Sequence, residues 1–130
     1  MTVPPGTRVL ARARLPDVDP EFLADVRRWL KSPLHGCTPG AVREAAVVLG
    51  ELLGNAFRHA RPPFTVEVSL PSPGTAVRMA VHDATPSPAA GWPLGRGLTI
   101  VRRLCPDWGV ERDADGKAVW AELPVLVAPV

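Results

Sequence analysis

The chain has 130 residues, of which 46% are hydrophobic and 22% are charged, a length and composition typical of a single globular domain. Its formal net charge of +2 is the small difference between 15 basic and 13 acidic side chains, and no block of like charge occurs, which argues against a large nucleic-acid-binding surface. No segment reaches the roughly 20 apolar residues that span a bilayer, and the first residues lack the apolar core of a signal peptide, so we expect a cytoplasmic protein.

The N-terminal part predicts a strand followed by a helix. The sequence TRVLARARLP, residues 7–16, alternates between apolar positions and mostly arginine, the pattern of a strand with one buried face. Asp19 then caps a helix of about three turns that begins with Pro20 and Glu21. The apolar stripe of this helix consists of Phe22, Leu23, Val26, Trp29 and Leu30.

The longest helix is predicted over about residues 40–60. Thr38 and Pro39 give its start signal, and the sequence RPP ends it. Apolar residues recur at three- and four-residue spacing, as expected for a helix that packs on the core: Val42, Ala45, Ala46, Leu49, Leu52, Leu53, Ala56, Phe57 and Ala60. The polar residues predicted to lie outside this stripe are Glu44, Glu51, Asn55, Arg58 and His59.

The second half of the chain is predicted to be mostly strand. Residues 64–70 and 75–83 alternate as two antiparallel strands joined by a proline-glycine turn, and residues 84–97 form a loop by composition. A short helix follows over 98–105, and 108–123 form a hairpin with an Asp-Gly turn. This order predicts an α+β fold, a two-layer sandwich of a mostly antiparallel sheet with helices packed on one face. We expect one domain over residues 1–130, with its core from about 8 to 124.

The two cysteines are predicted to be buried free thiols. Cys37 and Cys105 are far apart and belong to no CxxC or Cys/His ligand spacing, so neither a disulfide framework nor a zinc site is expected. Free cysteine generally packs inside proteins, and it persists in reducing compartments.

Polar residues on the long helix have the spacing of a ligand site. Glu51 and Asn55 are four residues apart and share one helix face, and His59 extends this line by a turn. A carboxamide oxygen suits Mg²⁺, which shares its shell with waters and phosphates, and a nearby carboxylate can deprotonate an attacking hydroxyl. The alternative is a solvated polar stripe with a structural histidine.

Two further features favour the ligand interpretation. Asp83 ends an apolar strand and opens the long loop, where its carboxylate could accept a hydrogen bond from an exocyclic amino group. The sequence GRGL, residues 95–98, stands where a loop enters a helix, a place suited to phosphate. The alternatives are a strand-ending aspartate that begins a turn and a plain glycine turn.

The sequence ELLGNAFRHA, residues 51–60, resembles the N-box of the GHKL superfamily, which contains gyrase-type ATPases and histidine kinases, and GRGL resembles its second glycine box. The ending WGVERDADGKAVWAEL resembles that of anti-sigma-factor serine/threonine kinases and related ATP-binding regulators abundant in actinomycetes. The resemblance extends from about residue 8 to residue 123. It implies the histidine kinase-like, or Bergerat, ATPase fold.

The resemblance also implies roles for single residues. Asn55 would coordinate Mg²⁺, and Glu51 would act as general base or polarise the attacking group. Asp83 would bind the adenine amino group of ATP, and Arg58 would stand where the kinases often carry a phosphate-contacting lysine. A mobile lid over residues 84–94 would cover the phosphates. The remaining nucleotide-binding positions are His59, Gly95, Arg96, Gly97 and Leu98.

The implied activity is transfer of the ATP γ-phosphoryl group to a serine or threonine of a STAS-domain antagonist. Another surface would sequester a sigma factor, and such regulators commonly work as homodimers, without direct contact to nucleic acid or membrane. Three arginines on the polar side of the first predicted strand leave two interpretations open, a dimer or partner surface and a solvated sheet edge: Arg8, Arg12 and Arg14.

The sequence departs from the family pattern around the nucleotide. The first glycine box, usually DxGxG, reads DATPS, so Thr85 and Ser87 replace glycines, and Lys117 stands where many relatives have a threonine near adenine. Only 11 residues separate Asp83 from Gly95, which makes a short lid. An alternative function is therefore a non-catalytic module that binds a partner, with weak or lost nucleotide binding. An ATPase that drives conformational change is less favoured, because no transducer domain is evident.

Overall fold

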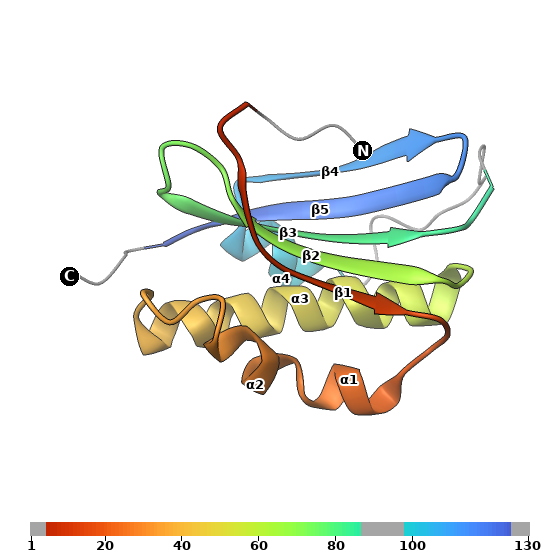
Figure 1. Ribbon diagram of the computed structural model, residues 1–130, viewed down its shortest axis with the longest axis horizontal. Coiled ribbons are helices and arrows are strands. Elements are labelled where there is room, and N and C mark those ends of the chain that lie inside the picture. Colours follow the sequence, from red (N-terminus) through yellow and green to blue (C-terminus); the bar gives the residue numbers. More distant parts are fainter. Residues whose placement is uncertain (1–4, 87–97, 126–130) are drawn as a thin grey trace.

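A computed structural model describes residues 5–86 and 98–125 of the chain. Within these residues, five antiparallel strands form one sheet in the order β1-β2-β3-β5-β4, and the helices cover one face of it (Figure 1). The predicted α+β, two-layer architecture is confirmed. In chain order the elements are β1 (Arg8–Leu15), α1 (Pro20–Ala24), α2 (Val26–Lys31), α3 (Pro39–His59), β2 (Phe64–Leu70), β3 (Ala76–Asp83), α4 (Thr99–Leu104), β4 (Asp107–Asp113) and β5 (Gly116–Pro124).

The central strands separate apolar from charged side chains by their alternation. Val77, Met79 and Val81 of β3 are buried in the core between the sheet and the helices. Arg78, between the first two, therefore lies on the helix-free face. There it donates a hydrogen bond to Glu122 over 2.9 Å, and its guanidinium lies over the ring of Trp120. Cross-strand ion pairs thus hold the face that no helix covers.

The single helix predicted after residue 19 is wrong, because the structure has two short helices, α1 and α2. They are separated at Asp25, whose backbone angles (φ −98°, ψ 6°) leave the helical region. Aspartate competes with the backbone for hydrogen bonds and is a weak helix former. The predicted cap is present, since Asp19 accepts a hydrogen bond from the Phe22 N–H over 2.9 Å. Phe22 packs edge-to-face on Trp29 across the break.

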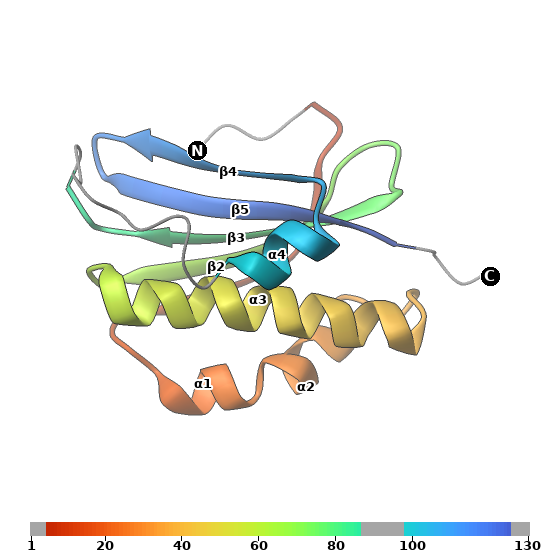
Figure 2. The ribbon, with the colours of Figure 1, turned by 180° about the vertical axis from the view of Figure 1, so that it is seen from behind.

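The long helix α3 begins as predicted. The Thr38 hydroxyl accepts a hydrogen bond from the Ala41 N–H over 3.1 Å, and Pro39 occupies the first turn. The helix lies along the sheet beside α4 (Figure 2). Its buried residues include Val48, which the predicted stripe omitted. Among residues 5–86 and 98–125, no helix combines the length and hydropathy needed to cross a membrane.

The cysteines differ in their surroundings. Cys105, directly after α4, is buried as predicted, whereas Cys37 is only half-buried, because it lies in the connection that precedes α3. Burial, together with the negative charge of Glu44, raises the pKa of Cys105 to about 11. Its thiol therefore stays protonated at neutral pH.

The start of β5, at the turn of the β4–β5 hairpin, packs closely on the end of β3. Gly116 has φ +150°, and a Cβ built on it would overlap the backbone carbonyl oxygen of Asp83. Only glycine fits this conformation and this space. This close approach lies next to the position where Lys117 stands directly opposite Asp83 in the strand register.

We predict that Gly116→Ala lowers the free energy of unfolding by about 2 kcal/mol or more, because the new methyl group meets the β3 backbone in a strained conformation. Urea denaturation measures this. Gly50→Ala is the matched control, since a Cβ on Gly50 of α3 meets nothing within 4 Å; it should stabilise the protein by about 0.5–1 kcal/mol. Equal effects of the two substitutions would contradict the packing described for Gly116.

Candidate functional site

The predicted site lies at the end of the sheet near the C-terminal end of α3, where β3 ends and β5 begins (Figure 1). Asp83 is the last residue of β3 and is in phase with the buried Val81, so it lies on the helix-covered face. Lys117 of β5 is its partner in the strand register. Two charged side chains, Asp83 and Lys117, therefore lie at the end of an otherwise apolar core.

Asp83 and Lys117 form a buried ion pair. The ammonium nitrogen Nζ of Lys117 donates to Oδ2 of Asp83 over 2.6 Å, and each side chain is only 1% exposed. The other carboxylate oxygen, Oδ1, accepts a hydrogen bond from the Thr85 N–H over 2.8 Å. Both oxygens of the predicted adenine-binding carboxylate thus have partners within the chain.

Backbone and side-chain bonds tie the segment after β3 to the end of α3. The Ala84 N–H donates to the carbonyl oxygen of Arg61 over 2.9 Å, and the Arg61 N–H donates to the Thr85 hydroxyl over 3.0 Å. Thr85 stands at the first glycine position of the predicted glycine box, and here it fixes the turn. Asp83 therefore also begins a turn, as the structural alternative expected.

Asn55, the predicted magnesium ligand, is buried at 5% exposure, so its prediction as a polar residue outside the packed stripe is wrong. It follows the buried Leu52 by three residues and so stands beside it on the helix surface. Its oxygen Oδ1 accepts a hydrogen bond from Nη2 of Arg58 over 2.9 Å. A guanidinium therefore stands beside the atom that would bind the metal.

The other predicted site residues lie in different surroundings. Glu51 is half-buried one turn before Asn55, His59 is exposed at the end of α3, and Leu98 is buried just before α4. Gly95, Arg96 and Gly97 lie outside the described residues, as do Ser87 and all of the predicted lid after residue 86.

Lys117 was predicted to lie near adenine, but its ion-pair partner Asp83 was not predicted. The sequence does indicate that Lys117 is buried, because it is in phase with the inward-facing Val119 and Ala121 of β5. A lysine on a buried face needs a counter-charge. Asp83, in phase with the core of β3, is the carboxylate that supplies it.

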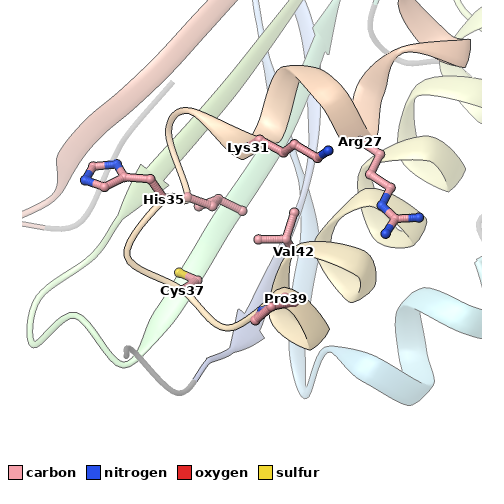
Figure 3. Close-up of a pocket in the computed structure, with 7 residues that line it drawn as sticks. Arg27, Lys31, His35, Cys37, Pro39 and Val42 are labelled. Carbon is pink, nitrogen blue, oxygen red and sulfur yellow. The ribbon is translucent and has the colours of Figure 1, made fainter. Parts of the chain in front are cut away.

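A separate hollow of about 230 Å³ lies between α2 and the start of α3. Figure 3 shows side chains of α2, of the connecting segment and of α3 around it. Its first residue on α3 is Pro39, about 24 Å along the helix from Asn55. None of the predicted site residues lines this hollow, whose lining consists of Arg27, Lys31, Leu34, His35, Cys37, Pro39 and Val42.

Comparison with known proteins identifies a family over most of the chain. The model of a family described as histidine kinase-like ATPase domain matches residues 17–123. A search of the curated proteins found no match to the chain. An ATPase domain implies ATP binding, typically with Mg²⁺.

The described geometry does not fit a bound Mg²⁺–ATP, although the donor atoms are of the right kind. Each oxygen of the Asp83 carboxylate accepts a hydrogen bond within the chain, from Lys117 and from the Thr85 N–H. The side chain is also only 1% exposed, so the adenine amino group expected there does not reach it in this structure. A Mg²⁺ ion at the predicted ligand atom, the amide oxygen of Asn55, would lie beside the guanidinium of Arg58, which is an exposed side chain. A cation of the chain therefore stands at each of the two positions.

We predict that Asp83→Asn lowers the free energy of unfolding by about 3–5 kcal/mol, because it leaves the Lys117 ammonium buried without a counter-charge. Chemical denaturation near neutral pH measures the loss. Asp115→Asn, an exposed position in the β4–β5 turn, serves as control and should change stability by no more than about 0.5 kcal/mol. A loss below about 1 kcal/mol for Asp83→Asn would show that the pair is not buried and closed as described.

Proposed function

The chain belongs to the histidine kinase-like ATPase domain family, and from that premise we propose that it is a regulatory protein of the anti-sigma-factor type. It controls transcription by binding a sigma factor and the STAS-domain antagonist of that interaction. The family match supports an ATP-binding regulatory protein. The sequence ending from Trp108 to Leu123, which resembles that of the anti-sigma-factor kinases, supports this finer assignment.

We further propose that the protein acts by sequestration without phosphoryl transfer. One observation carries this choice: the polar groups expected to hold the nucleotide, Asp83 and Asn55, are each engaged by a cation of the chain. The fold then serves as a scaffold whose outer surfaces bind partners. Sequestration of a partner needs the fold of the family but not its phosphoryl-transfer reaction.

A second candidate is protein serine/threonine kinase activity. The observation that favours it is the placement of Glu51, which remains half-buried one turn before Asn55 on the same helix. A carboxylate there suits a general base toward a serine hydroxyl. Phosphoryl transfer depends mainly on positioning and charge stabilisation, so the two residues alone do not supply it.

The proposed setting is a cytoplasmic homodimer that contacts proteins and neither nucleic acid nor membrane. In the described sheet β1 is an edge strand. Arg12 is held by Glu67 of β2 through a 2.6 Å ion pair, as expected for a protected edge. Arg8 and Arg14 are exposed on the same strand, and we propose them for a partner surface.

We predict that the purified protein, incubated with labelled ATP, Mg²⁺ and STAS-domain proteins encoded near its gene, transfers no phosphate to them. A complex with a sigma factor should form equally well with and without ATP, as measured by calorimetry. Glu51→Ala should leave that complex unchanged, because Glu51 has no catalytic task in sequestration.

Labelled phosphate on an antagonist serine or threonine, lost in Glu51→Ala, would reject sequestration and establish the kinase. An authentic anti-sigma-factor kinase assayed with its own antagonist provides the positive control for the transfer reaction.

A further inference from the structure

The buried ion pair places the Lys117 ammonium against the carboxylate that was predicted to bind adenine. We propose that the Lys117 ammonium occupies the hydrogen-bonding position in front of Asp83 where the adenine amino group would bind, and thereby excludes adenine nucleotides. This inference rests on the proposed function, because it names the residue that makes partner binding independent of ATP. It also predicts that one substitution reopens the site.

The chemistry of the two donors is the basis of the exclusion. An exocyclic amino group presents neutral N–H donors to a carboxylate, whereas an ammonium presents charged donors, and charge-assisted hydrogen bonds are shorter and stronger. The distance of 2.6 Å between Nζ of Lys117 and Oδ2 of Asp83 lies at the short end of that range. Lys117 is therefore a stronger donor to Asp83 than an adenine amino group would be.

Burial turns this competition into a large penalty for the nucleotide. Both side chains are 1% exposed, so neither is open to an incoming base in this structure. In the proposal, adenine reaches Asp83 only after Lys117 moves away. Its charge would then lose its partner within the core, and breaking one side of a buried ion pair is strongly destabilising. The penalty corresponds to a loss of at least about 100-fold in affinity for adenine.

The fold holds Lys117 in place. Its neighbours Gly116 and Ala118 are buried within β5, and Gly116 packs so closely on Asp83 that no side chain fits there. Arg58 differs, because it is exposed, and its contact with Asn55 can open without leaving a buried charge. Lys117, and not Arg58, is therefore the residue that closes the site.

The test is calorimetric titration of the wild type and of Lys117→Thr with Mg²⁺–ATP and, separately, with adenosine, which needs neither metal nor phosphate contacts. Threonine shortens the side chain and retains a hydroxyl donor for Asp83, which limits the loss of stability. We expect no binding by the wild type at millimolar ligand. Lys117→Thr should bind both ligands, with at least about 100-fold higher affinity than the wild type.

Three variants make the result specific. Glu122→Gln disrupts a second cross-strand ion pair of β3 and β5, the partly buried pair of Arg78 with Glu122, and should behave as the wild type. Arg58→Ala should also behave as the wild type. Lys117→Thr combined with Asp83→Asn should lose the gained adenosine binding, because the acceptor is gone.

Micromolar binding of Mg²⁺–ATP by the wild type would overturn the proposal, and this arm stands whether or not Lys117→Thr folds. A folded Lys117→Thr variant that gains no affinity for either ligand would also overturn the proposal. An equal gain in ligand affinity in Arg58→Ala would overturn it as well. The proposed function is tested by a different result, because phosphate transfer to an antagonist would reject it. The titrations with Mg²⁺–ATP and adenosine do not depend on that result.

Discussion

The structure depends on one buried ion pair, in which the Lys117 ammonium lies 2.6 Å from the Asp83 carboxylate. Removing two charges from water costs several kcal/mol for each ion, and only close geometry and further hydrogen bonds offset this cost. The Thr85 N–H supplies one such bond, and Gly116 lets the two strands approach closely enough. The turn after β3 and the β4–β5 hairpin are thus organised around the same pair of charges.

In the proposed function, the pair separates the family fold from its nucleotide chemistry. The helix that carries Glu51 and Asn55 is retained, and its packing against the sheet follows from its apolar stripe alone. At the same end of the sheet, the Lys117 side chain is buried against Asp83, where the adenine base was predicted to bind. Such a site keeps its shape without a ligand, and partner binding then needs no nucleotide to order the fold. The proposal is consistent with the fold because the residues that pack the sheet and helices differ from those predicted to bind nucleotide.

Most of the fold could be predicted because local patterns determine it. Alternation identified the strands, the Thr38 cap identified the start of α3, and the Asp-Gly turn identified the final hairpin. The break at Asp25 was missed, since the apolar period continues through it. The role of Lys117 was missed for another reason: its partner lies 34 residues away. Alternation shows which side of a strand is buried, but not which strands are neighbours.

Lysine labelling tests the central claim most directly, because the chain has only two lysines, Lys31 and Lys117. Lys31 is exposed on α2 and provides an internal standard. An amine-reactive reagent should modify Lys31 rapidly and leave Lys117 unmodified in the folded protein, as mapped by mass spectrometry, both without nucleotide and with Mg²⁺–ATP at millimolar concentration. Modification of Lys117 at a rate close to that of Lys31 once Mg²⁺–ATP is added would contradict the account, since it would mean that ATP displaces the lysine and enters the site.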